Sequence, residues 1–300
     1  MTFSALAMAL GLLAQTPAPP QPQAVQDPVE LGDVTVEARR LRAVVQDFVG
    51  EIAAPAASRG PARWNGAVCV GVVNLRADVA QYIVDRTSDV ARELGVAAGE
   101  PGCSPNVLII AAADGRAVAD GIVAARRNAF NPGGSGMTRS LRALGEFRSS
   151  DAPIRWWHVS GPVDSESGEL ATRLPGYEAP RINVSRASRI RTDIRDDLFK
   201  AIIVVDVEQV AGLSLTQLAD YCALVALAQV DPEADVAAFD TILNVFADAT
   251  VPGLTAWDMD YLNALYGVEQ SSVGANARGA EIVDQMTRRR MMEVAAPTAD

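Results

Sequence analysis

Two continuous apolar runs, separated by one amphipathic segment, constrain the fold of this chain more than any other feature. Residues 67–75 read AVCVGVVNL and residues 106–113 read NVLIIAAA. Runs of this kind, without polar alternation, are typical of strands that are buried on both faces of a sheet. The segment between them, residues 76–95, repeats apolar residues at helical spacing and ends in glycine. Because a strand, a helix and a second strand with short connections form a right-handed parallel crossover, we expect a parallel sheet.

Further strand-like segments follow the crossover. We expect residues 155–159 and 181–190 to form an antiparallel pair at a sheet edge, and residues 198–207 to form another buried strand. Residues 218–230, LADYCALVALAQV, then read as a helix with an apolar face. The sequence therefore predicts the α/β class, with a mixed, mostly parallel sheet that helices cover and a helical C-terminal part.

Other local patterns mark where elements begin. Val34 and Val36 alternate as in a short strand, and residues 41–48 continue as a helix. An S-x-x-Q capping box begins at Ser214, and Thr255 is placed to cap the last clear helix.

The chain divides into four parts. Residues 1–18 contain FSALAMALGLLA, which is too short to span a bilayer and is typical of a signal peptide. Neither Lys nor Arg precedes this stretch, so the true start and the cleavage site stay open. We expect residues 19–28 to form a Pro-rich linker, residues 29–270 a single α/β domain, and residues 271–300 a polar C-terminal tail.

Three cysteines bear on the compartment. Cys69 and Cys103 each touch one of the two buried strands, and a disulfide between them would close a loop of about 34 residues. Such a staple stabilises a protein by about 3 to 4 kcal/mol in an oxidising compartment, and the alternative is two buried free thiols. Cys222 lies in the middle of a predicted helix, where we expect a buried thiol. Together with the signal peptide, the pair predicts a periplasmic or secreted protein.

Charge excludes some partners. The formal net charge is −11 and the pI is about 4.7, so the chain should repel nucleic acid and anionic membrane surfaces. No stretch approaches the 18 apolar residues of a membrane helix, and we expect no membrane span in the mature protein.

The region from residue 65 to residue 268 contains the stretches CVGVVNL, PGCSPNVLII, APIRWWHVSGPVDS and QLADYCALVALAQVDP. With these stretches the chain resembles a group of uncharacterised exported proteins of Gram-negative bacteria, which implies export and no assigned activity. The order of its elements also resembles, more distantly, the N-terminal half of the zincin metallopeptidases. Residues 254–267, LTAWDMDYLNALYG, look like the helix that follows the metal site in that superfamily.

The zinc-binding motif of that scaffold is missing. Zinc peptidases place histidines at i and i+4 of one helix, with a Glu beside the first as general base. The matching positions here are Ala219, Asp220 and Ala223, and the chain's one histidine, His158, lies on another segment. We therefore expect no bound metal, no cofactor and no zinc-peptidase activity. The helix is either a metal helix without its metal or an ordinary core helix, and the sequence leaves both open.

The candidate binding residues are Arg155, Trp156, Trp157, His158 and Asp220. Adjacent tryptophans on a strand point to opposite faces, and an exposed indole can stack on a sugar or pack on a peptide, although indoles more often fill cores. No catalytic residue is assigned. The sequence thus favours a non-catalytic exported binding or accessory protein, whose partner is a peptide, a glycan or an envelope protein.

The alternative is a hydrolase that uses carboxylates without zinc. Asp206 and Glu208 lie two apart at a strand end, where paired carboxylates can serve acid/base chemistry, or can simply be solvated. A cleft holding either carboxylate together with His158 would favour the enzyme. The acidic turn at residues 164–169 lacks EF-hand spacing, and the glycine-rich stretch 131–138 follows a helix instead of opening one. We expect neither a calcium site nor a phosphate loop there.

Overall fold

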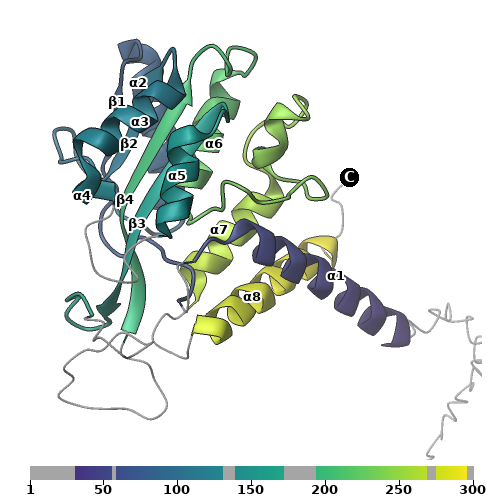
Figure 1. The fold of residues 1–300 in the computed structure, drawn as a ribbon. Coiled ribbons are helices and arrows are strands. Elements are labelled where there is room, and N and C mark those ends of the chain that lie inside the picture. The colour runs from purple at the N-terminus through teal and green to yellow at the C-terminus, as the bar shows by residue number, and fades with distance from the viewer. Residues whose placement is uncertain (1–30, 56–58, 131–138, 172–193, 269–274, 296–300) are drawn as a thin grey trace, which may run out of the picture.

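The computed structural model describes residues 31–55, 59–130, 139–171, 194–268 and 275–295 (Figure 1). The predicted signal peptide and linker, the glycine-rich stretch 131–138 and the predicted strand 181–190 lie outside these residues.

The described strands form one four-stranded mixed sheet in the order β1-β2-β4-β3. Strands β1 (Val70–Val73), β2 (Val107–Ala112) and β4 (Ile194–Asp206) are parallel, and β3 (Ile154–Asp164) pairs antiparallel with β4 at one edge. The predicted α/β class, with a mostly parallel sheet, is confirmed. The edge strand β3 pairs with the buried strand β4, and its predicted partner, residues 181–190, lies outside the described residues.

Helices cover both faces of this sheet (Figure 1). Helices α2 (Ala77–Glu93) and α6 (Leu215–Leu227) lie on one face, and α3 (Gly115–Ala125), α4 (Arg127–Phe130) and α5 (Leu141–Ser149) lie on the other. Beyond α6 lie the remaining helical elements, which are α1 (Leu31–Ile52), η1 (Ile242–Phe246), α7 (Ala256–Gly267) and α8 (Ala275–Ala295).

Alternate residues of the central strands feed two hydrophobic clusters. Ile109 and Ile203 belong to the cluster under α2 and α6, whereas Ile110 and Ile202 belong to the cluster under α3 to α5. The two apolar runs of the sequence thus have this pattern because both faces of these strands are covered by helices.

Helix α6 begins with the predicted capping box. The Ser214 hydroxyl accepts the N–H of Gln217, and the Gln217 side chain accepts the N–H of Ser214. Every residue from Ala219 to Leu227 is buried, so α6 is covered on all sides and not along one face only.

Two predictions at the ends of the domain are wrong. Val34 and Val36 lie in helix α1, because the chain around them continues a helix whose apolar side packs against α8. The predicted polar tail is largely helix α8, in which Ile282, Val283 and Met286 are buried against the rest of the domain. The sparse apolar residues of this segment fall on one face, and that spacing is enough to dock a helix.

Arginines of α8 complete this docking. Arg289 and Arg290 both bind the buried carboxylate of Asp260 in α7, at 3.1 and 3.3 Å, and the Arg290 guanidinium lies 5.0 Å from the centre of the Trp257 ring. These two arginines therefore join α8 to α7.

The predicted disulfide between Cys69 and Cys103 is confirmed, with a Cα–Cα distance of 6.1 Å. It ties the entrance of β1 to the loop before β2. Cys222 is a free, buried thiol, and burial raises its pKa to about 12. Among the residues that the structure describes, no helix is both long enough and apolar enough to cross a membrane.

Candidate functional site

A pocket of about 190 Å³ lies beside β3, on the edge of that strand that does not face β4. Residues 154–158 of the strand line it. Helix α5 contributes Ala143 and Phe147 from one face of the sheet, and Tyr221 of α6 and Phe246 of η1 contribute from the other. The pocket therefore opens where the two helical layers meet the edge of the sheet.

The orientation of the β3 main chain follows from its pairing with β4. The N–H of Asp206 donates to the carbonyl oxygen of Pro153 at 2.9 Å, which makes these two residues a hydrogen-bonded pair. Hydrogen-bonded and non-hydrogen-bonded pairs alternate along an antiparallel ladder. Arg155 and Trp157 consequently also direct their main-chain groups towards β4.

The intervening residues Ile154, Trp156 and His158 direct their N–H and C=O groups away from β4, towards the pocket. These groups make no hydrogen bond to another residue within the described part of the chain. An unpaired strand edge of this kind is a template for a further strand.

The two adjacent tryptophans contribute their indole rings to the core. Trp156 packs near Tyr221 and donates its Nε1–H to the carbonyl of Val230, whereas Trp157 packs near Phe147 and donates to the carbonyl of Phe130. Both indoles are buried, one in each hydrophobic cluster. Trp156 and Trp157 line the pocket, but neither ring is exposed for stacking on a ligand.

His158 holds the strand against α6. Its Nε2 lies 2.7 Å from the carbonyl oxygen of Val225, so the neutral ring donates at this nitrogen. Burial lowers the pKa of His158 to about 4, against a smaller opposing effect of this hydrogen bond. The imidazole is therefore neutral near pH 7.

Arg155 lies on the opposite face and is only 2% exposed. Its Nη2 donates to the carbonyl of Ala152 at 2.8 Å, and its Nε and Nη1 make no hydrogen bond within the described residues. Burial lowers the pKa of Arg155, while the nearby carboxylate of Asp206 raises it. Arg155 is the counter-charge of a buried carboxylate.

Asp206 caps neighbouring main chain. Its carboxylate accepts the N–H of Gly115, at the start of α3, and the N–H of Gln209, each at 3.2 Å. Burial alone raises the pKa of Asp206. The hydrogen bonds together lower this pKa by more, so the net shift is downward. Neither Asp206 nor the exposed Glu208 lines the pocket with His158.

Asp220 does not line this pocket either. Its carboxylate accepts from the Nε of Arg86 in α2 at 2.5 Å and from the N–H of Leu254 at 2.8 Å. Ala219 and Ala223 are fully buried, where small side chains allow close packing. Helix α6 is thus a core helix, and Asp220 does not line the pocket that His158 lines.

The lining of the pocket contains both charged and aromatic side chains. The Nη2 of Arg139 lies 3.1 Å from the carboxylate of Asp231. Tyr221 and Phe246 contribute an aromatic pair, with ring centroids 5.6 Å apart. The sequence predicts a helix with an apolar face at residues 218–230, which include Tyr221, and it contains no signal for Phe246.

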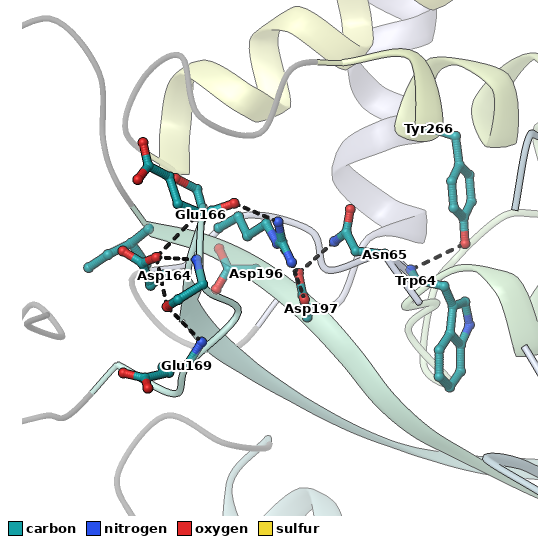
Figure 2. Close-up of polar contacts among 12 residues, drawn as sticks. Trp64, Asn65, Asp164, Glu166, Glu169, Asp196, Asp197 and Tyr266 are labelled. Atoms are coloured by element: carbon teal, nitrogen blue, oxygen red, sulfur yellow. Dashed lines mark hydrogen bonds and ion pairs between the residues drawn. The ribbon is translucent and has the colours of Figure 1, made fainter. Parts of the chain in front are cut away.

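A second polar region lies at the far end of the sheet (Figure 2). Asp164 accepts the N–H groups of Glu166 and Ser167, and Arg195 binds both carboxylate oxygens of Asp197. The acidic turn is therefore organised by its own backbone. Among the described residues, no three His, Cys, Asp or Glu side chains gather as a potential metal-binding group.

No protein-family model, curated protein or solved structure matches the chain. The described residues define an α/β protein with a mixed sheet and a pocket beside an unpaired strand edge. The function has to be inferred from that arrangement.

Proposed function

We propose that this chain is an exported, non-catalytic binding protein that holds an extended peptide along the edge of β3. One observation carries the proposal. The main-chain groups of Ile154, Trp156 and His158 face a pocket and have no partner within the described residues. An extended peptide presents donors and acceptors at the same two-residue period, and strand addition is a recurring mode of peptide recognition.

A peptide suits this pocket better than a glycan. The indoles of Trp156 and Trp157, which the sequence offered for stacking on sugars, are buried and engaged by carbonyl groups, and β3 presents main-chain groups without partners in the described residues, which match a peptide. The partner classes expected from the sequence thus reduce to a free peptide or an extended segment of an envelope protein.

The non-catalytic part of the proposal rests on how the titratable groups are used. His158 is bonded to a helix carbonyl, Asp206 caps α3, and Asp220 joins α6 to α2. A general base needs a free lone pair directed at substrate, and the Asp206 and Asp220 carboxylates accept hydrogen bonds from the protein itself, whereas His158 is a buried imidazole that donates its Nε2–H to Val225. The hydrolase alternative therefore has less support.

Export is supported by the Cys69–Cys103 disulfide, because such bonds persist in oxidising compartments. Fractionation of a Gram-negative host that expresses the chain should find it in the periplasm or medium, shortened at its N-terminus. Full-length protein confined to the cytoplasm would contradict the export part of the proposal. The proposed resemblance to the zincin scaffold rests only on the order of the helices and strands.

The binding test uses random heptapeptides displayed on phage, selected on the immobilised protein. A selected peptide should slow amide hydrogen exchange at Ile154, Trp156 and His158 and leave Arg155 and Trp157 unchanged, because the latter already face β4. N-methylation of alternate peptide nitrogens should weaken binding at least tenfold.

A matched pair of variants places the site. Ala152→Trp adds a large ring to a residue that lines the pocket, whereas Ala124→Trp adds the same ring to an exposed position of α3 outside it. The first variant should lose binding and the second should retain it. Selection of no peptide, or equal binding by both variants, would reject strand addition.

A further inference from the structure

Tyr221 offers the pocket a hydroxyl that the protein does not use. The residue is only 6% exposed and lines the pocket, yet its hydroxyl makes no hydrogen bond within the described residues. The hydroxyl of Tyr261 is sealed from solvent and has no partner in the described residues. The hydroxyl of Tyr221, in contrast, is not sealed from solvent. It is therefore accessible from the pocket.

The other tyrosines near α6 illustrate the difference. The hydroxyl of Tyr266 donates to the carbonyl of Leu227 at 2.7 Å, and the hydroxyl of Tyr82 lies 3.1 Å from the hydroxyl of Thr216. A buried tyrosine hydroxyl normally finds a partner. That of Tyr221 has none within the described residues, so a group that enters the pocket can supply the partner.

Phe246 supplies an apolar surface next to this hydroxyl. It is 39% exposed, and it packs edge-to-face on Tyr221, which in turn packs edge-to-face on Trp156 at 6.0 Å. Three rings thus lead from the core to the pocket. A large aromatic side chain left exposed beside a concave surface is typical of a binding anchor.

We infer that Tyr221 and Phe246 select one position of the bound peptide. A large apolar side chain of the peptide packs on Phe246, and the Tyr221 hydroxyl donates a hydrogen bond to an acceptor of the same peptide. This inference rests on the proposed strand addition and adds sequence preference to it, because main-chain pairing alone does not discriminate between sequences.

The chemistry of the pocket supports this assignment. Burial raises the pKa of Tyr221, so the hydroxyl stays protonated and can donate at every physiological pH. Of the charged residues that line the pocket, Arg139 is paired with Asp231 and Glu146 with Arg142. The ring of Phe246 therefore favours contact with an uncharged, apolar side chain.

The experiment compares phage selections on the wild type, Phe246→Ala and Tyr221→Phe. Peptides selected on the wild type should share a large apolar residue at one position. Phe246→Ala should lose that preference and bind the selected peptides about tenfold more weakly. Tyr221→Phe should weaken the same peptides about fivefold without lowering the melting temperature, because the lost hydroxyl has no partner in the free protein.

Matched controls are Tyr82→Phe, which also removes a hydroxyl, and Leu170→Ala, which truncates an exposed apolar residue outside the pocket. Both should bind like the wild type. Replacing the shared apolar peptide residue by Ala should abolish the difference between wild type and Phe246→Ala.

The outcomes separate the two proposals. Two results would overturn this inference and leave strand addition intact. In both, N-methylation weakens peptide binding. Either the selected peptides share no apolar residue at one position, or peptides selected on Phe246→Ala show the same preference as those selected on the wild type. Unchanged affinity of Tyr221→Phe would also overturn it. Selection of no peptide, or indifference to N-methylation, would overturn both. A concentration-dependent dimer that Phe246→Ala abolishes would assign the surface to a second copy and also overturn the inference.

Discussion

The carboxylate of Asp220 in α6 and the guanidinium of Arg86 in α2 lie 2.5 Å apart. The distant resemblance to zincin peptidases predicts that Asp220 stands where those enzymes have their glutamate. Here the carboxylate also accepts the N–H of Leu254, and Gly253 lies so close that an added Cβ would fall 2.2 Å from the carboxylate oxygen. An acidic side chain in this helix thus joins three segments of the core.

We therefore expect Asp220→Ala to lower the free energy of unfolding by about 2–3 kcal/mol, because it leaves a main-chain N–H and part of a guanidinium without partners. Asp89→Ala, which removes an exposed carboxylate of α2, is the control and should cost less than about 0.5 kcal/mol. Urea denaturation measures both. Equal stability of the two variants would contradict the structural role of Asp220.

Much of the fold was predictable from apolar patterns. Residues 106–113 and 198–207 have few polar residues and therefore had to be central strands. The errors fall where the pattern is short or sparse. Val34 and Val36 alternate over only three residues, which is too few to distinguish a strand from the start of a helix.

The site was predictable only in part. The segment Arg155–His158 was singled out for its composition, and it does line the pocket. What the segment offers there, however, is main chain, and the direction of main-chain groups depends on the register with β4. Phe246 reaches the pocket because η1 packs on Tyr221, a contact between residues that are not neighbours in the chain and that no local pattern encodes.

The disulfide should contribute to stability through the unfolded state. Reduction should lower the free energy of unfolding by about 3 to 4 kcal/mol, because the opened loop regains chain entropy. Cys103 is exposed, so reductant can reach the bond in the folded protein. Thermal melts with and without reductant measure this effect in the wild type and in Cys222→Ala. The double variant Cys69→Ser/Cys103→Ser should not respond, and a response there would point to another cause.

His158 should make stability depend on pH. Its pKa is about 4 in the folded protein and about 6.5 when unfolded, so between these values the unfolded chain binds more protons. The stability that the neutral ring contributes is fully present above pH 6.5 and is lost as the pH falls towards 4. We expect the wild type to lose up to about 3 kcal/mol more than His158→Gln over this window.

Urea denaturation at several pH values between 4 and 7 gives this difference directly. His158→Gln keeps an amide donor for the carbonyl of Val225 but cannot take up a proton in this range. Carboxylates titrate equally in both proteins, and the subtraction removes their effect. Parallel curves for the two proteins would show that the imidazole is not buried.

The last prediction concerns α8, which sequence analysis took for a polar tail. Met286 is 0% exposed and belongs to the main hydrophobic cluster, whereas Met292 on the same helix is 65% exposed. Met286→Ala should therefore cost about 2–4 kcal/mol of unfolding free energy, because it removes buried surface and leaves a cavity. Met292→Ala should cost less than about 0.5 kcal/mol, since it changes only solvated surface. If α8 were a solvated tail, both variants would unfold at the wild-type urea concentration; a difference confined to Met286→Ala would show that this helix is part of the domain.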